Sequence, residues 1–291
     1  MNQTAVRQLR ALLALSRVSH LPTVWSNCLA GWWLGGHGNF AKLPLLFFGV
    51  SALYTGGMFL NDAFDADFDR QRRTERPIPS GAISVTAVWR WGVGWLGLGA
   101  LCLTAVGKTT GLLTLVLLLC IILYDATHKV VTASPWLMGV CRFWVYVIAG
   151  SAGAAGMNGG PIWCGVALAL YVTGMGCLAQ HESSRGRIPY WPLALMVAPV
   201  GLAMIINSAE LREPAMWLSL VLVLWTARCV RTIFQAVPVN VTHMVSGLLA
   251  GVVFVDLLAV GPLPFCPLWL KIIFLALFGS TLLLQRFVPP A

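Results

Sequence analysis

Ten stretches of about twenty mostly apolar residues follow one another along the chain, separated by short polar segments. A helix of about 20 apolar residues crosses the hydrocarbon core of a bilayer. The stretches lie approximately at 18–36, 42–62, 86–106, 109–127, 135–156, 161–180, 190–208, 214–235, 242–260 and 266–285. The ninth is the weakest, since it is short and carries His243 and Asp256. The pattern predicts an all-α, multi-pass transmembrane helical bundle of nine to ten helices, with residues 1–291 forming a single domain.

The composition supports the same fold class. Of the 291 residues, 58% are hydrophobic and 10% are charged, whereas about 25% of the residues of a soluble domain are charged. A soluble fold could not bury so much apolar surface, so a lipid bilayer is the expected surrounding.

The basic residues are distributed unequally between the two sides of the predicted bundle. With the N-terminus in the cytoplasm, thirteen of the 19 Lys and Arg residues fall on the cytoplasmic side, three on the other side and three within the stretches. Cytoplasmic loops of membrane proteins are enriched in Lys and Arg. The asymmetry predicts a protein of the cell or inner membrane with the segments around Asp69, Lys129 and Glu182 on the cytoplasmic side. It also explains most of the net charge of +9, so nucleic acid is not an expected partner.

Four of the ten acidic residues lie within eight positions at the end of the second apolar stretch, from Asp62 to Asp69. The surrounding residues 59–81 read FLNDAFDADFDRQRRTERPIPSG. Asp62, Asp65 and Asp69 are spaced i, i+3 and i+7, which places them within roughly 60° on one face of a helix. Three carboxylates so close together repel one another unless a cation neutralises them, and Mg²⁺ prefers such oxygen ligands together with substrate phosphates. Asp67 points to another face and is expected to be solvated.

Arginines follow these acids directly. Arg72, Arg73 and Arg76 offer planar guanidinium groups that bind phosphate oxygens in pairs. An isolated Asp or Arg beside an apolar stretch would be interpreted as part of a solvated loop. The acidic and basic clusters together instead predict a site for a metal-chelated diphosphate at the cytoplasmic end of the bundle.

The segment from Asn61 to Asp69, with RPIPSG at residues 76–81, resembles the first aspartate-rich motif of the UbiA superfamily of intramembrane prenyltransferases. The resemblance implies a helical bundle with a central cavity, a Mg²⁺-bound prenyl diphosphate, and transfer of the prenyl group to a hydrophobic acceptor. Carried over by residue, it implies that Mg²⁺ and diphosphate are held by Asn61, Asp62, Asp65 and Asp69, and that phosphate is contacted by Arg72, Arg73 or Arg76.

Two further segments are similar to the same family. In YDATHK, residues 124–129, the resemblance implies that Tyr124 and a basic residue face the diphosphate; Lys129 is the expected match, and His128 lies one residue closer to the family's spacing. Arg142 is expected either to contact phosphate or to pair with Asp125. The segment RVSHLPTVWSN, residues 17–27, is similar to the family's first helix, and its Asn27 is expected either to line the cavity or to form a helix–helix hydrogen bond.

The second aspartate-rich motif of the family is sparse in this chain. Residues 171–186 read YVTGMGCLAQHESSRG, in which only Glu182 is acidic. Glu182 is therefore the one expected metal ligand from this segment. Sparse second motifs are typical of a divergent, EboC-like branch of the superfamily, to which we expect the chain to belong.

The sequence thus predicts a Mg²⁺-dependent prenyltransferase that moves a prenyl group from a prenyl diphosphate to an aromatic or lipid-like acceptor within the membrane. Two alternatives remain open. The first is a catalytically weak relative that only binds prenyl diphosphates, and the second is a membrane transporter whose acidic cluster is an ion site.

Overall fold

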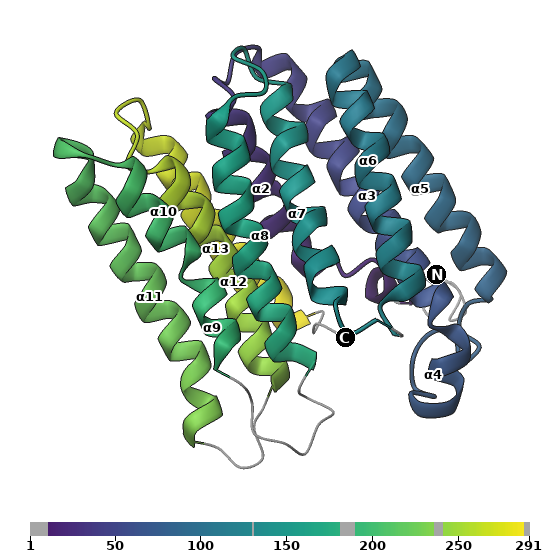
Figure 1. Cartoon of the computed structure of the whole chain (residues 1–291). Coiled ribbons are helices and arrows are strands. Elements are labelled where there is room, and N and C mark those ends of the chain that lie inside the picture. Colours follow the sequence, from purple (N-terminus) through teal and green to yellow (C-terminus); the bar gives the residue numbers. More distant parts are fainter. Residues whose placement is uncertain (1–10, 130, 181–189, 236–240, 288–291) are drawn as a thin grey trace.

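A computed structural model describes residues 11–129, 131–180, 190–235 and 241–287, and within these ranges every regular element is helical (Figure 1). The helices are α2 (Leu21–Leu34), α3 (Leu43–Phe64), α4 (Ala66–Arg72), α5 (Val85–Val106), α6 (Lys108–Thr127), α7 (Ser134–Ser151), α8 (Gly159–Gln180), α9 (Trp191–Met196), α10 (Ala198–Ile206), α11 (Arg212–Gln235), α12 (Val241–Val260) and α13 (Leu268–Phe287). Most run side by side as one bundle, and the short α4 lies at one end of it (Figure 1). The predicted all-α bundle is confirmed.

Each of the ten apolar stretches coincides with helical structure, to within a few residues at most boundaries. The seventh is divided into α9 and α10 at Val197. Pro199 explains the division, because proline has no N–H and its ring clashes with the carbonyl group four residues earlier. The first is shortened to 14 residues, since a 3₁₀ turn (Val18–His20) precedes α2.

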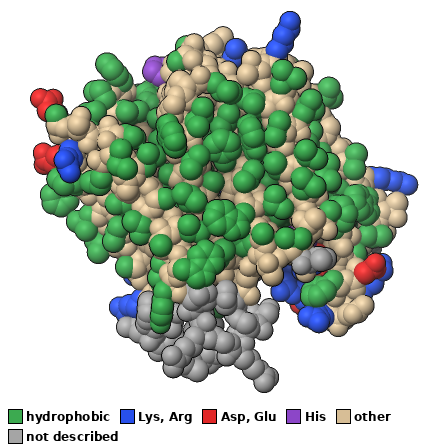
Figure 2. Space-filling view, in the orientation of Figure 1, with side chains coloured by type: hydrophobic (Ala, Val, Ile, Leu, Met, Phe, Trp, Pro, Cys, Tyr) green, Lys and Arg blue, Asp and Glu red, His purple; other side chains and the backbone are tan. Residues whose placement is uncertain are grey.

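Six helices in the described part of the chain are long and apolar enough to cross a membrane by length and composition: α3 with the turn before it, α6, α8, α11 with the turn before it, α12 and α13. The surface agrees with this assignment. In Figure 2 hydrophobic side chains cover the broad middle of the visible face, while the charged side chains lie toward its edges. Leu101 and Ile205 are 71% and 81% exposed, which is costly in water and favourable in lipid. The chain is an integral membrane protein.

The helix α12 lies in the interior of the bundle and contacts α2, α8, α11 and α13. It corresponds to the ninth apolar stretch, which was the weakest candidate in the sequence, yet 72% of an apolar 18-residue segment of this helix is buried. The helices α2 and α7 also pack closely, because a Cβ atom added at Gly31, or at Gly35 just after α2, would collide with the backbone of Tyr146 or Gly150. Small residues permit such approach in membrane bundles.

Candidate functional site

The three predicted carboxylates lie together where α3 passes into α4. Asp65 joins the two helices, and the hydrogen bonds Asp65 N to Asn61 O (3.0 Å) and Asp69 N to Asp65 O (2.9 Å) continue the helical pattern across the junction. Asp62, Asp65 and Asp69 are all buried. Arg76 joins two of them, since its Nη1 lies 2.8 Å from Asp69 Oδ2 and 3.3 Å from Asp62 Oδ1.

The other charged residues of this segment are exposed. Asp67 is exposed and pairs with Arg70 at 2.7 Å. Arg72 and Arg73 are also exposed, and the Arg72 guanidinium lies 4.8 Å from the ring centre of Phe68. Of the three arginines predicted to bind phosphate, Arg76 is thus the one that the fold brings to the carboxylates.

The end of α6 supplies two basic groups to Asp65. His128 Nε2 lies 3.1 Å from one carboxylate oxygen and Lys129 Nζ lies 3.0 Å from the other. Burial acts to raise the pKa of Asp65, but the hydrogen bonds and positive charges of His128 and Lys129 outweigh it and hold this pKa below its ordinary value. His128 also stacks on Tyr124, with ring centres 5.3 Å apart. Both residues that matched the family's basic position therefore reach the same carboxylate.

Sequence reasoning missed a role for Arg17 at this site. Its Nη2 lies 3.8 Å from Asp62 Oδ1 and 3.4 Å from Asn61 Oδ1, although 45 positions separate Arg17 from Asp62 in the chain. The amide nitrogen of Asn61 donates to Asp125 Oδ1 at 3.2 Å. The position of Arg17 before the first stretch suggested only a topological charge. Its pairing depends on helix packing, which the sequence pattern does not report.

A cavity of about 270 Å³ adjoins these residues inside the bundle. Its walls come mainly from apolar side chains of α3, α6, α7, α8 and α12. Its polar lining residues are Arg17, His20, Tyr54, Tyr124, Asp125 and Arg142. Because Arg17 and Asp125 contact Asp62 and Asn61, the carboxylate cluster borders the polar part of this cavity. An apolar chamber with convergent polar groups is typical of a site for an amphiphilic small molecule.

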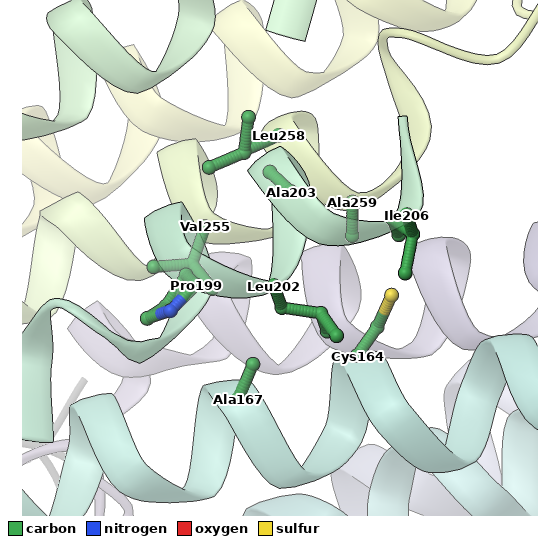
Figure 3. Close-up of a pocket in the computed structure, with 9 residues that line it drawn as sticks. All are labelled: Cys164, Ala167, Pro199, Leu202, Ala203, Ile206, Val255, Leu258 and Ala259. Atoms are coloured by element: carbon green, nitrogen blue, oxygen red, sulfur yellow. The ribbon is translucent and has the colours of Figure 1, made fainter. Parts of the chain in front are cut away.

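A much smaller space of about 10 Å³ lies between α8, α10 and α12 (Figure 3). Only apolar side chains and the Cys164 thiol line it. Its volume corresponds to about one water molecule at most. It therefore has neither the size nor the polar groups of a substrate site.

Asn27 and Arg142 lie farther inside the bundle and contact each other. Arg142 Nη1 donates to Asn27 Oδ1 at 2.7 Å, and Asn27 Nδ2 donates to Asp256 Oδ2 at 2.7 Å. Asn27 thus forms the helix–helix hydrogen bonds that were one of its two expected roles. Arg142 lines the cavity, and within the described residues no ion pair joins it to Asp125.

The donor set fits a divalent cation that arrives with a phosphate ligand. Asp69 Oδ1 and Asp125 Oδ2 are buried without a hydrogen-bond partner, so each is available to coordinate a cation. Across the described residues no three His, Cys, Asp or Glu side chains form a ready-made metal cluster, and the expected ligand Glu182 lies outside those residues. Mg²⁺ commonly uses one or two carboxylates plus water and substrate phosphates, so a complete protein cage is not required.

The fold and site together define an integral membrane protein with an internal apolar cavity bordered by acidic and basic side chains. The profile of the UbiA prenyltransferase family matches residues 20–288. The chain therefore belongs to the UbiA prenyltransferase family, which confirms the predicted superfamily.

Two relatives illustrate the similarity in sequence. The digeranylgeranylglyceryl phosphate synthase of Ignicoccus hospitalis is 36% identical over 104 residues, which cover 36% of this chain and 34% of that protein. The synthase of the same name from Methanothrix thermoacetophila is 37% identical over 87 residues, covering 30% and 33%. The matched stretches thus span about a third of each relative. These names do not test the EboC-like branch, which stays a prediction.

Solved structures show the same fold. The apo structure of a UbiA homolog from Aeropyrum pernix K1 has a TM-score of 0.64 at 17% identity, covering 92% of this chain and 98% of that one. A UbiA homolog from Archaeoglobus fulgidus bound to GPP and Mg²⁺ has a TM-score of 0.51 at 14% identity, covering 95% and 99%.

Proposed function

We propose that this protein is a prenyltransferase that transfers a prenyl group from a prenyl diphosphate to a hydrophobic acceptor, with Mg²⁺ as cofactor. The observation that carries the proposal is the cluster of Asp62, Asp65 and Asp69 with Arg76 and Lys129 at the polar part of the apolar cavity. GPP and Mg²⁺ bound to the Archaeoglobus fulgidus homolog support it. The names of the sequence relatives favour a lipid-like acceptor over an aromatic one.

The charged and polar residues of the site would bind Mg²⁺ and the diphosphate group. Asp62, Asp65 and Asp69, with Glu182 from the segment after α8, would hold Mg²⁺. When bound, this ion would neutralise the charge that develops on the leaving diphosphate. Further contacts to the diphosphate would come from Asn61, Arg72, Arg73, Arg76, Tyr124, Lys129, Arg142 and, through Arg142, from Asn27.

The cavity would bind the prenyl chain of the substrate. Its apolar walls would hold the prenyl chain and exclude water, so that the allylic carbon is attacked by the acceptor and not hydrolysed. Arg17 lies 3.8 Å from Asp62 at the border between cavity and cluster. It would keep the diphosphate end of the substrate oriented toward the carboxylates.

We further propose that the site faces the cytoplasm. The excess of basic residues on that side supports this orientation. Within the fold, the C-terminal ends of α3, α6 and α8 lie at the same end of the bundle. Asp65, just after α3, contacts Lys129, just after α6. Gln180, the last residue of α8, donates to Oγ of Ser134, the first residue of α7, at 3.0 Å.

Incubation of the purified protein with radiolabelled geranyl diphosphate, Mg²⁺ and a membrane lipid extract tests the transfer. The expected result is an extractable labelled product whose formation stops when EDTA is added. Binding of geranyl diphosphate without any product would favour the binding-only alternative. The family assignment already favours transfer over transport.

A further inference from the structure

Asp256 is a buried carboxylate that none of the roles above uses. It lies on α12 with 0% of its surface exposed. Tyr146 Oη donates to its Oδ1 at 2.6 Å, and Ser26 Oγ and Asn27 Nδ2 donate to its Oδ2. No described Lys or Arg lies within ion-pair distance of it. An ionisable side chain inside a membrane bundle is costly and commonly marks a functional group.

Asn27 links this carboxylate to Arg142. Its amide nitrogen donates to Asp256 Oδ2 and its amide oxygen accepts from Arg142 Nη1, both at 2.7 Å. Because a carboxylate can only accept here, it fixes the orientation of the Asn27 amide, with the oxygen turned toward Arg142. The connection therefore runs through α12, α2 and α7 in turn.

A second neutral oxygen completes the support of Arg142. Arg142 Nη2 donates to Thr23 Oγ1 at 3.2 Å, and the Thr23 hydroxyl donates its own hydrogen to His20 O at 2.8 Å. The Thr23 oxygen is thereby left to accept from the guanidinium. Both Nη atoms of Arg142 are held by uncharged groups, in contrast to Arg76, which pairs directly with two carboxylates.

The positive charge of Arg142 thus remains available at the cavity. The guanidinium is among the lining groups and lies 6.0 Å from the ring centre of Tyr54. A direct carboxylate partner would compete with an anionic ligand for the same donors. Asp256 instead compensates the charge from a distance, across Asn27, so that the pair can be buried without blocking the side of Arg142 that meets the cavity.

We propose that Asp256 is a positioning residue for prenyl transfer: through Asn27 it holds the Arg142 guanidinium at the polar part of the cavity, where Arg142 binds the diphosphate group. The inference rests on the proposed function and deepens it. Asp256 does not touch the substrate; it acts only through Arg142. A purely structural Asp256 would stabilise the bundle without influencing ligand binding through Arg142.

A double-mutant cycle separates these two roles. The variants are Asp256→Leu, which keeps the branched shape and removes the acceptor, Arg142→Met, and the combination of both. The assay is calorimetric titration of the purified protein with geranyl diphosphate in the presence of Mg²⁺. Arg142→Met is expected to weaken binding about 10- to 150-fold, and Asp256→Leu about tenfold or more. In the Arg142→Met background, Asp256→Leu should change the affinity by less than about twofold.

Tyr146→Phe is the matched control. It removes the donor to the other oxygen of Asp256 and leaves the link through Asn27 intact. Its affinity should stay within about twofold of the wild-type value. Melting temperatures are measured for every variant. If Asp256→Leu does not fold, Asp256→Asn replaces it, since it removes the charge while keeping one acceptor oxygen.

The inference would be overturned if the Asp256 substitution weakened geranyl diphosphate binding equally in the wild-type and the Arg142→Met backgrounds. It would also be overturned if that substitution lowered the melting temperature and left the affinity unchanged. Either result leaves the proposed function standing, provided that the wild-type protein binds geranyl diphosphate in a Mg²⁺-dependent way. Absence of such binding in the wild-type protein would instead reject the proposed function, and the inference with it.

Discussion

Arg76 pairs with two of the three carboxylates, so its removal should show how much the stability of the cluster depends on a positive charge at this position. Its Nη1 lies 2.8 Å from Asp69 and 3.3 Å from Asp62, and the side chains of Arg76, Asp69 and Asp62 are only 13%, 3% and 8% exposed. Removing one partner of a buried ion pair costs about 3–5 kcal/mol, because the other charge stays buried without compensation. We expect Arg76→Met to lose about that amount of unfolding free energy in EDTA.

Most of the lost unfolding free energy should come from Asp69, whose carboxylate would stay buried without its positively charged partner. Asp62 keeps Arg17 at 3.8 Å, whereas the second oxygen of Asp69 already lacks a partner. A divalent cation can replace the missing guanidinium, and a ligand at 100 times its dissociation constant stabilises a folded protein by about 2.7 kcal/mol. Mg²⁺ should therefore restore part of the stability of Arg76→Met and raise that of the wild-type protein less.

The assay is unfolding of the detergent-solubilised protein in EDTA and in Mg²⁺, with Arg72→Met as the control. Arg72 is exposed, lies on the Phe68 ring and forms no ion pair with the three carboxylates among the described residues, so its substitution should stay within about 0.5 kcal/mol of the wild-type protein. The reasoning is refuted if the two variants are equally stable in EDTA, or if Mg²⁺ stabilises Arg76→Met no more than the wild-type protein.

Three further predictions concern turnover, the second motif and orientation. Asp65→Asn should abolish transfer at saturating Mg²⁺; its melting temperature is measured in parallel, because His128 and Lys129 lose their counter-charge, and wild-type turnover would contradict the assignment of Asp65 as a metal ligand. Glu182→Gln should weaken the Mg²⁺-dependent part of diphosphate binding by about 1.5–3 kcal/mol, measured by calorimetry, and an unchanged value would place the rest of the site elsewhere. Asp67→Cys, at an exposed position of α4, should react with a membrane-impermeant maleimide only from the cytoplasmic side, and labelling from outside alone would reverse the proposed orientation.

The helices could be predicted closely because hydrophobic length is a local property of the sequence. The stretches at 86–106 and 109–127 match α5 and α6 to within one residue. The burial of a helix depends instead on its packing against other helices. His243 and Asp256 made the ninth stretch the weakest candidate for a membrane-spanning helix. In the structure Asp256 receives three hydrogen bonds from α2 and α7, and these bonds allow α12 to lie in the interior.

The same distinction applies to the site. The spacing of Asp62, Asp65 and Asp69 was visible because all three belong to one continuous segment. The partners of these acids were visible only in part. Arg76 follows in the same segment, whereas Arg17 reaches Asp62 only through the packing of the chain before α2 against α3. Periodicity gives the face on which a residue lies and does not give the residue that faces it from another helix.

The central claim is that the buried acids of residues 62–69 bind diphosphate through Mg²⁺, and calorimetry with three Asp→Asn variants tests it most directly. Asp62→Asn and Asp69→Asn change buried carboxylates beside Arg76, while Asp67→Asn makes the same change at an exposed position of the same segment. Titration with geranyl diphosphate in Mg²⁺ should give wild-type affinity for Asp67→Asn. The other two variants should bind at least about tenfold more weakly, the effect of losing one charge-assisted contact. Equal affinities for all three variants would contradict the account.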